Sequence, residues 1–452
     1  MPTEPTKGLV IAAPSSGSGK TLVTLGLLRA LTRQGVAASG IKTGPDYIDP
    51  AFHRAATGRP CFNLDPWAMP PDRLRALADH AGAGAEITIA EGVMGLFDGA
   101  ADGSGSTADL AAALGWPVVL VLDVMGQSTS AAAIVEGFRR FRDDVTIAGI
   151  ILNRTGSDRH AGMIAEAVAT LKSPPAVLGA IPRDEFVSVP SRHLGLVQAE
   201  EHHDLDALLE RAADLVEKHV DMDLLRSLGD RARQTNDAAH PAADTDAPGL
   251  PVLGQHIAIA RDRAFAFCYD IVPLSWQAQG VTVSFFSPLA DEAPSPDADA
   301  VYLPGGYPEL HAGRLAENSC FLNGLRGLAA LERPIFGECG GYMVLGEALI
   351  DADGAGHAMA GLLPLTTSFA SRKRHLGYRR ARTLGSSILG PAGSGFAAHE
   401  FHYSTVTAEG PGDPLFAVTD ARGETLGNAG LVRGSVAGSF LHLIDRAPKG
   451  TS

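Results

Sequence analysis

The loop formed by residues 13–21 constrains the fold of this chain more than any other segment. It has the sequence APSSGSGKT, follows an apolar run and precedes leucines at helical spacing, which together predict a strand, a tight loop and a helix. Small residues let backbone N–H groups approach a polyphosphate, and the start of a helix adds partial positive charge. Lys20 can then reach the β- and γ-phosphates and Thr21 can bind Mg²⁺, although Pro14 replaces the first glycine of the usual pattern. The segment therefore predicts a nucleotide-binding P-loop.

Further apolar runs in the first half lack polar alternation, as expected for parallel strands that are buried on both faces. The helix after Lys20 can end at Gly35, because glycine readily adopts the left-handed conformation found after helices. Strands alternating with helices predict an α/β domain with a doubly wound, mostly parallel sheet. The predicted strands span residues 9–13, 37–42, 87–91, 118–123, 147–152 and 176–181.

The composition changes near residue 230, where a polar stretch rich in Ala and Pro begins and apolar periodicity ends. We interpret it as a linker. Beyond it, new strands are predicted at 256–260, 281–286, 300–303 and 334–337, which indicate a second α/β domain that ends near Asp445. The expected organisation is a first domain at 1–229, a linker at 230–253 and a second domain at 254–447.

The overall charge and the cysteines limit the kinds of partner. The formal net charge of −14 argues against a nucleic acid or an anionic membrane surface, since both require a basic face. No apolar stretch is long enough to span a bilayer, and the first residues are polar. The four cysteines show neither metal-ligand spacing nor a disulfide framework, which fits a reducing cytoplasm.

Two acidic residues follow predicted strands inside glycine-containing loops. Asp46 lies in KTGPDYIDP and Glu91 in EGVMGLFDG. Ligands of such sheets bind at the C-terminal ends of the strands, and Mg²⁺ on phosphates takes carboxylate ligands. We therefore expect Thr21, Asp46 and Glu91 to share Mg²⁺. The residues expected to bind ATP are Ser16, Gly17, Ser18, Gly19, Lys20, Thr21 and Asn153.

The second half contains a candidate nucleophile, Cys339, in the segment GECGGYM after a predicted strand. Flanking glycines permit the sharp turn of a nucleophile elbow, and the helix that follows is expected to lower the pKa of the thiol. His442, in GSFLHL, is the candidate base, because a Cys–His pair can be distant in sequence and adjacent in the fold. Backbone N–H groups of Gly306 and Tyr307, after another strand, are expected to form an oxyanion hole.

These motifs occur together in a recognisable order. The stretches APSSGSGKT, KTGPDYIDP, EGVMGLFDG, PSRHLGLVQAEE, LPGGYPE, GECGGYMVLG, HEFHYS and GSFLHL cover nearly the whole chain. Their set resembles the cobyrinic/hydrogenobyrinic acid a,c-diamide synthases. The first half is similar to amidoligase domains of the dethiobiotin-synthetase type, and the second half is similar to class I glutamine amidotransferase domains of the cobalamin pathway.

The resemblance implies a reaction in two parts. Cys339, with His442 as base, would release ammonia from glutamine. ATP would phosphorylate an acetate carboxylate of hydrogenobyrinic or cobyrinic acid, and ammonia would displace the phosphate, first at one acetate and then at the other. An enclosed route keeps ammonia unprotonated and nucleophilic. Residues expected near the corrinoid are Ile48, Asp98, Arg192 and His193, with the basic segment 372–375 as a further candidate.

The sequence departs from other class I amidotransferases at the third residue of the expected triad. Ile444 stands where those enzymes have a glutamate two residues after the histidine. Asp445 would face the other way on a strand, and Glu400 is a candidate substitute. We therefore expect a Cys–His dyad, with any orienting acid supplied elsewhere.

Several alternatives stay open at this level. Cobyric acid synthase and sirohydrochlorin a,c-diamide synthase have similar domains, and the sequence does not tell whether the corrinoid contains cobalt. A partition-type P-loop ATPase is the non-enzyme alternative. It is disfavoured because Ser15 stands where those proteins have an additional lysine, and because it has no use for Cys339. A homodimer is a further expectation that the sequence itself does not establish.

Overall fold

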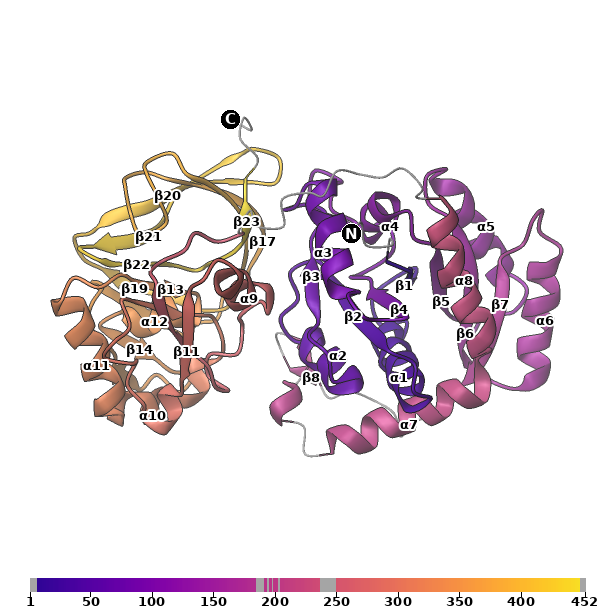
Figure 1. Ribbon diagram of the computed structural model, residues 1–452, viewed down its shortest axis with the longest axis horizontal. Coiled ribbons are helices and arrows are strands. Elements are labelled where there is room, and N and C mark those ends of the chain that lie inside the picture. The colour runs from indigo at the N-terminus through magenta and orange to yellow at the C-terminus, as the bar shows by residue number, and fades with distance from the viewer. Residues whose placement is uncertain are drawn as a thin grey trace. The chain divides into compact units, whose positions relative to one another are not determined.

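The computed structural model describes residues 6–183, 191–192, 195–196, 198–201, 204–235 and 249–447 of the 452-residue chain. The chain divides into two compact units, Met1–Thr245 and Asp246–Ser452. Each unit contains its own sheet with helices packed on it, as Figure 1 shows. The prediction of two α/β parts is confirmed.

The N-terminal unit is built on a seven-stranded sheet in which every pairing is parallel. The central strands are buried throughout, which explains their uninterrupted apolar sequences. Six strands were predicted, and all six are present. Across the sheet the strands are β3 (Phe62–Leu64), β2 (Ala38–Thr43), β4 (Ile87–Glu91), β1 (Gly8–Ala12), β5 (Val118–Asp123), β6 (Ile147–Thr155) and β7 (Ala176–Pro182).

Helices connect these strands on both faces of the sheet (Figure 1). The P-loop helix begins at Lys20 and is followed by Gly35 at φ 78°, as the sequence predicts. The helices are α1 (Lys20–Arg33), α2 (Asp49–Thr57), α3 (Pro71–Ala81), α4 (Thr107–Leu114), α5 (Ala131–Phe141), α6 (Asp158–Ala169), α7 (Leu205–His219) and α8 (Met222–Thr235). Shorter elements are β8 (Ser191–Arg192), β9 (Gly195–Leu196) and the 3-10 turn η1 (Ala199–Glu201).

The stretch expected to be a linker begins inside a helix. Helix α8 continues to Thr235, so residues 230–235 are helical despite their polar composition. Its earlier part carries the buried residues Leu225 and Leu228, and a helix that is anchored on one side can extend into a polar sequence. The remainder of that stretch up to residue 248 lies outside the described residues.

The C-terminal unit is built on a ten-stranded mixed sheet. Its first five strands pair in parallel, and the other pairings are antiparallel. The parallel strands are β11 (Thr282–Phe286), β10 (His256–Ala260), β12 (Ala300–Leu303), β13 (Ile335–Glu338) and β22 (Val436–Ser439). The sheet continues with β21 (Thr425–Arg433), β20 (Asp413–Asp420), β17 (His375–Thr383), β18 (Gly395–His402) and β23 (Leu441–Arg446).

A four-stranded sheet and several helices complete this unit. The sheet consists of β15 (Gly356–Ala358), β14 (Ala348–Ile350), β16 (Leu365–Ser368) and β19 (Thr405–Glu409). The helices are α9 (Ile271–Ala278), α10 (Ala312–Glu317), α11 (Ser319–Ala330) and α12 (Gly340–Leu345), with 3-10 turns η2 (Pro288–Ala290) and η3 (Pro308–His311).

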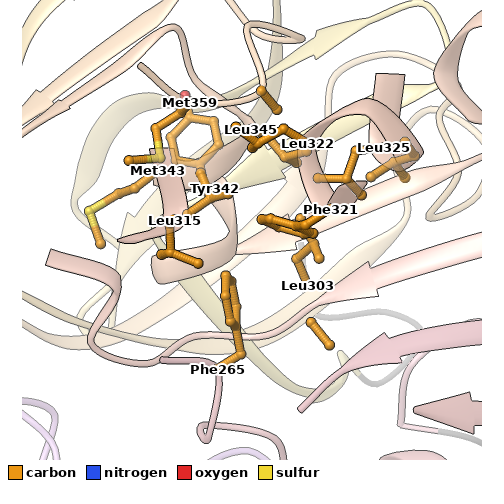
Figure 2. Close-up of a cluster of buried hydrophobic side chains, with 14 of the residues drawn as sticks. Phe265, Leu303, Leu315, Phe321, Leu322, Leu325, Tyr342, Met343, Leu345 and Met359 are labelled. Atoms are coloured by element: carbon orange, nitrogen blue, oxygen red, sulfur yellow. The ribbon is translucent and has the colours of Figure 1, made fainter. Parts of the chain in front are cut away.

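A large apolar core fixes the helix that follows the candidate nucleophile. Figure 2 shows Tyr342, Met343 and Leu345 of α12 within this core, which also contains Leu303 and Phe321. Each fully buried side chain of this size contributes about 1.5–3 kcal/mol relative to an exposed one. The core therefore holds the backbone of α12, and with it the turn at Cys339, in one position.

Membrane-spanning helices are not found in the part of the chain that the structure describes, since none of its helices is both long and apolar enough.

Candidate active sites

The P-loop connects β1 to α1 and requires glycine at two of its positions. Gly17 and Gly19 have φ angles of 79° and 87°, in the left-handed region. A Cβ atom on Gly19 would also lie 2.2 Å from Nδ2 of Asn153, a distance that no side chain could tolerate. Both positions therefore require glycine because of their backbone conformation, and position 19 requires it also because Asn153 at the end of β6 leaves no room for a side chain.

Two residues of β6 hold the P-loop from the side. Asn153 Nδ2 donates to the carbonyl oxygen of Ser18 at 2.9 Å, so the residue expected at the nucleotide does lie against the loop. Arg154 donates to the carbonyl oxygen of Gly17 at 2.6 Å and forms an ion pair with Asp123 at 2.8 Å. Arg154 lies outside the P-loop pattern, which ends at residue 21, so the sequence gives no signal for its role.

Lys20 lies at the start of α1 and is almost fully buried. Its Nζ donates to the carbonyl oxygen of Met94 at 3.2 Å. Burial lowers the pKa of Lys20, and the nearby Glu91 carboxylate partly opposes this effect. The lysine is thus held next to the EGVMGLFDG loop, and an anionic phosphate would restore its preference for the charged form.

Glu91, at the end of β4, is the centre of a buried polar network. The Thr21 hydroxyl donates to Glu91 Oε1 at 2.5 Å, and Lys42 Nζ donates to the same oxygen at 3.0 Å. His53 Nε2 lies 2.6 Å from the other oxygen, Oε2. Burial alone would raise the pKa of Glu91, but Lys42 and His53 outweigh it and lower the pKa. Glu91 is therefore a fixed carboxylate although its exposure is 0%.

Lys42 also forms an ion pair with Asp49, the first residue of α2. Burial opposes the charge of Lys42, but Asp49 and Glu91 raise its pKa overall. Asp46 lies just before this helix, where its Oδ1 accepts hydrogen bonds from the backbone N–H groups of Ile48 (2.7 Å) and Asp49 (3.0 Å). The carboxylates of the KTGPDYIDP loop are thus oriented by the start of α2.

The donor set at these strand ends fits Mg²⁺. The Thr21 hydroxyl and the Glu91 carboxylate are in direct contact, and Asp46 is close enough to affect the pKa values of Lys20 and Lys42. These are hard oxygen donors, which Mg²⁺ prefers. The structure has Thr21 in contact with Glu91 beside the P-loop, and Asp46 in the loop that follows the neighbouring strand β2.

The residues expected near a corrinoid differ in their surroundings. Ile48 is 7% exposed, so burial leaves little of its side chain for a ligand. Asp98 is exposed, and its Oδ2 accepts a hydrogen bond from the N–H of Gly95 at 2.8 Å. Arg192 belongs to β8, but its side chain and the whole of His193 lie outside the described residues.

Cys339 occupies a sharp turn between β13 and α12. Its φ of 46° and ψ of −100° form a strained backbone conformation for a residue other than glycine. The N–H of Cys339 donates to the carbonyl oxygen of Ser439 at 2.8 Å, which anchors the turn to the end of β22. This is the geometry of a nucleophile elbow, and it agrees with the turn inferred from the glycines.

The side chains of His442, on β23, and of Cys339 both lie close to Gly305. A Cβ atom on Gly305 would be 2.4 Å from Cε1 of His442 and 3.3 Å from Cβ of Cys339. Only a glycine at position 305 leaves room for both side chains. The candidate base and nucleophile, more than 100 positions apart in the sequence, are thus neighbours in the fold.

The candidate oxyanion residues also lie beside the turn. A Cβ atom on Gly340 would be 3.0 Å from the backbone nitrogen of Gly306, so this N–H lies next to the residue after the nucleophile. Tyr307 is buried, and its ring packs against Phe267 with 4.9 Å between centroids. The backbone of both residues is therefore held near Cys339.

The net shift in the pKa of the thiol is opposite to the expected one, although the N–H of Gly340 at the start of α12 does lower this pKa. Burial, and next the nearby Glu309, raise the pKa of Cys339. Helix α12 has only six residues, so the effect of its N-terminus is small compared with the loss of water. Burial, followed by His399 and His402, lowers the pKa of His442 to about 3. Both shifts favour the neutral form, of the thiol and of the imidazole.

The structure offers no simple replacement for the missing triad glutamate among the candidates. Ile444 is buried, and Asp445 Oδ1 accepts from the N–H of Arg446 at 2.8 Å. Glu400 pairs with Leu441 across β18 and β23, whereas His442 pairs with His399, so Glu400 and His442 belong to opposite faces of these strands. Glu400 binds Arg379 and His402 instead.

Comparisons with known proteins agree with both halves of this description. Residues 9–197 match the family model of a CobQ/CobB/MinD/ParA nucleotide binding domain. Residues 256–449 match that of a CobB/CobQ-like glutamine amidotransferase domain. A hydrogenobyrinate a,c-diamide synthase of Brucella anthropi is 57% identical over 440 residues, covering 97% of this chain and 98% of the relative. The chain belongs to the hydrogenobyrinate a,c-diamide synthase family.

Two further members of this family show the same full-length similarity. The synthase of a Sinorhizobium species is 56% identical over 441 residues, with 97% of this chain and 99% of the relative covered. The synthase of Rhodobacter capsulatus is 54% identical over 446 residues, with 98% of this chain and 99% of the relative covered. We call the N-terminal unit the P-loop unit and the C-terminal unit the thiol unit. The similarity to these relatives therefore extends over both units.

Several residues of the two sites were missed by sequence reasoning. Lys42 is the last but one residue of the buried strand β2, and His53 is buried on α2; neither position belongs to a general motif. A lysine within an apolar strand is a signal for a buried ion pair, because an unpaired charge there would be costly. Glu338 precedes the nucleophile and was missed although it lies in the quoted segment GECGGYM.

Glu338 is buried behind the turn, where Tyr302 donates to its Oε2 at 2.8 Å and the Leu443 N–H donates to its Oε1 at 3.2 Å. Burial raises the pKa of Glu338 to about 8. The side chain thus links β12, β13 and β23, the three strands that position the oxyanion residues, the thiol and the histidine.

Proposed function

We propose that the chain is an ATP-dependent, glutamine-hydrolysing ligase that amidates the a and c acetate carboxylates of hydrogenobyrinic acid. The observation that carries this proposal is the 57% identity to a hydrogenobyrinate a,c-diamide synthase over 97% of the chain. The site geometry supports it, because the P-loop and carboxylates occur in one unit and the Cys–His pair in the other.

Cys339 and His442 release ammonia in this proposal. Sγ attacks the side-chain amide of glutamine while His442 takes the thiol proton and returns it to the departing ammonia. The oxyanion that forms is stabilised by backbone N–H groups at Gly306 and Tyr307. Water then hydrolyses the thioester to glutamate. Because burial favours the neutral form of both groups, the proton moves from Sγ to His442 as Sγ attacks.

The N-terminal unit activates the carboxylate. The N–H groups of residues 16–21 and Lys20 bind the phosphates, with Asn153 supporting the loop from β6. Thr21, Asp46 and Glu91 hold Mg²⁺, which supplies charge neutralisation on the phosphates when bound. Lys42, fixed between Asp49 and Glu91, keeps Glu91 ionised. The acyl phosphate that results loses phosphate when ammonia attacks, once at each acetate.

The choice of substrate distinguishes the proposed function from the remaining alternatives. Hydrogenobyrinic acid, cobyrinic acid and sirohydrochlorin are each supplied with ATP, Mg²⁺ and glutamine, and the products are weighed by mass spectrometry. We expect a gain of two amides on hydrogenobyrinic acid. Amidation of cobyrinic acid alone, or of other side chains as in a cobyric acid synthase, would contradict the proposal. A partition-type ATPase would release no glutamate from glutamine.

The proposal includes a cytoplasmic location and small-molecule partners without nucleic acid, as the composition predicts. A homodimer stays a prediction. Size-exclusion chromatography with light scattering tests it, and a mass near the 46.9 kDa of one chain would contradict it.

A further inference from the structure

A carboxylate close to the thiol has no role in the chemistry described so far. Glu309 belongs to η3, which directly follows Tyr307 and packs against α12. A Cβ atom on Gly340 would lie 2.9 Å from Cδ of Pro308. The residue before Glu309 therefore abuts the residue after Cys339. The same short segment that carries the oxyanion residues thus brings a carboxylate to the nucleophile elbow.

One oxygen of this carboxylate is enclosed without a donor. Glu309 as a whole is half-buried, but its Oε2 is shielded from solvent and has no hydrogen-bond partner among the described residues. The carboxylate accepts a hydrogen bond only from its own backbone N–H. A buried acceptor that lacks a donor is unfavourable, and such groups are rare in folded proteins. A ligand that supplies the donor would remove this cost.

The surroundings of Glu309 favour a cationic ligand. Burial raises the pKa of Glu309 to about 7, and the nearby Arg372 acts in the opposite direction. Near neutral pH the side chain therefore changes readily between its two forms. A cation bound at Oε2 would favour the carboxylate, which would in turn hold the cation. A bound cation would thus provide both the missing donor and the missing charge.

Glutamine, the substrate of the thiol in the proposed function, carries such a cation. Its side-chain amide is neutral, but its α-amino group is an ammonium ion at neutral pH. In an extended glutamine the ammonium nitrogen is only about 5 Å from the amide carbon that Sγ attacks. The ammonium must therefore be bound close to Cys339. Of the charged side chains that influence the pKa of Cys339, Glu309 has the largest effect.

The other carboxylates that influence this thiol already have donors. Glu338 accepts hydrogen bonds from Tyr302 at 2.8 Å and from a backbone N–H at 3.2 Å. Glu400 accepts from Arg379 at 2.8 Å. Of these three carboxylates, only Glu309 has an enclosed oxygen without a partner.

We propose that Glu309 binds the α-ammonium group of glutamine and makes the thiol site specific for the free amino acid. The inference rests on the proposed release of ammonia by Cys339 and His442. The ammonium donates to Oε2, and this charged hydrogen bond holds the amide carbon at the thiol. An amide that lacks the ammonium leaves Oε2 without a donor and is used less well. Glu309 is thus a substrate-binding residue and takes no part in the proton transfer.

The test compares glutamine with glutaramate, which is the same molecule without the α-amino group. Ammonia release from each compound is measured with the full-length wild type and with Glu309→Gln. We expect the wild type to favour glutamine in kcat/KM by about 10- to 100-fold, the scale of a hydrogen bond to a charged group. In Glu309→Gln this preference should fall by about 10-fold, mainly through a higher KM for glutamine, while kcat/KM for glutaramate changes little.

The matched control is Glu317→Gln, which removes an exposed carboxylate from α10, the helix that follows η3. Its preference for glutamine should equal that of the wild type. A purely structural effect of Glu309→Gln would lower kcat/KM for both compounds equally, and this unchanged ratio would overturn the inference while the proposed function stands. Equal use of the two compounds by the wild type would also overturn it, whether or not the variant folds. If the wild type hydrolyses neither compound, the proposed function fails and the inference fails with it.

Discussion

The P-loop site and the thiol site both lie at the C-terminal ends of parallel strands, yet they treat charge in opposite ways. In the first, buried charged groups contact one another, and Glu91 stays ionised through Lys42 and His53. In the second, burial is the largest influence on both groups, and it raises the pKa of Cys339 and lowers that of His442. The comparison shows that equal burial can preserve charge or suppress it, depending on the partners.

This difference follows the chemistry that each site performs in our proposal. A polyphosphate and Mg²⁺ bring large charges of their own, and the P-loop unit offers fixed charges that complement them before they bind. Glutamine is attacked at a neutral amide, and a resting thiolate would be exposed to unwanted oxidation. The thiol unit therefore separates charge only during the reaction.

The strongest way to test this division is to remove the thiol. Cys339→Ala should lower glutamine-driven amidation by about 1,000-fold or more, because no other group can form the thioester. Amidation driven by added ammonia should stay near the wild-type rate, since the P-loop unit keeps its charges. Both rates are measured with the same corrinoid by mass spectrometry. Loss of the ammonia reaction in a folded variant would show that the two sites are not separable.

Removal of a charge from the P-loop site should have a slightly smaller but less selective effect. Glu91→Gln takes away the carboxylate that contacts Thr21 and Lys42. We expect both the glutamine-driven and the ammonia-driven rate to fall about 100-fold, which is the usual scale for one electrostatic contact to a reacting charge. Glutamate release from glutamine alone reports the thiol site and should persist. Near-normal amidation at ordinary Mg²⁺ would contradict the assignment of Glu91.

The comparison also explains what could be predicted from the sequence. The P-loop, the strand-end carboxylates and the elbow depend on local patterns, and the structure has each of them at the end of a predicted strand. Strand β3 was missed because it has three residues, and the antiparallel strands β17–β21 were missed because half-exposed strands contain many polar residues.

The electrostatic state of each site could not be predicted, because it depends on burial and on distant partners. The predicted direction of the pKa shift at Cys339 was wrong for this reason. The sequence indicates the helix that follows the thiol, but it does not show that the thiol is buried away from water. His53 and Lys42 likewise contact Glu91 from positions 38 and 49 residues away. Only the assembled sheet brings such residues together.

A milder change in the P-loop site tests the role of a positioning residue. His53 Nε2 lies 2.6 Å from Glu91 Oε2, and its Nδ1 is 3.4 Å from Cys61 Sγ. His53→Ala should raise the Mg²⁺ concentration needed for half-maximal amidation by about 10-fold, as is usual when the partner of a metal ligand is lost. His53→Gln retains a donor and should restore most of the Mg²⁺ affinity. Equal Mg²⁺ requirements in all three proteins would argue for a purely structural role.

The smallest expected effect concerns the pH dependence of stability in the thiol unit. Glu338 has an ordinary pKa of 4.5 in the unfolded chain, and burial raises it to about 8 in the folded protein. Between these two pH values the folded state holds a proton that the unfolded state has lost, so this group makes the protein less stable as pH rises. The total is on the order of a few kcal/mol at most. Glu338→Gln keeps the shape but cannot ionise, and its amide can still accept from Leu443 and contact Tyr302.

Calorimetric melting of the wild type and of Glu338→Gln from pH 5 to pH 8 measures this contribution. Other groups titrate equally in both proteins, so the difference between the two curves isolates Glu338. We expect the Tm of the wild type to fall by several degrees more than that of the variant, given roughly 2–4 °C per kcal/mol for a unit of this size. The slope should flatten above pH 8, where Glu338 ionises in both states. Parallel curves would mean that Glu338 is already charged in the folded protein, and that the thiol site retains charge much as the P-loop site does.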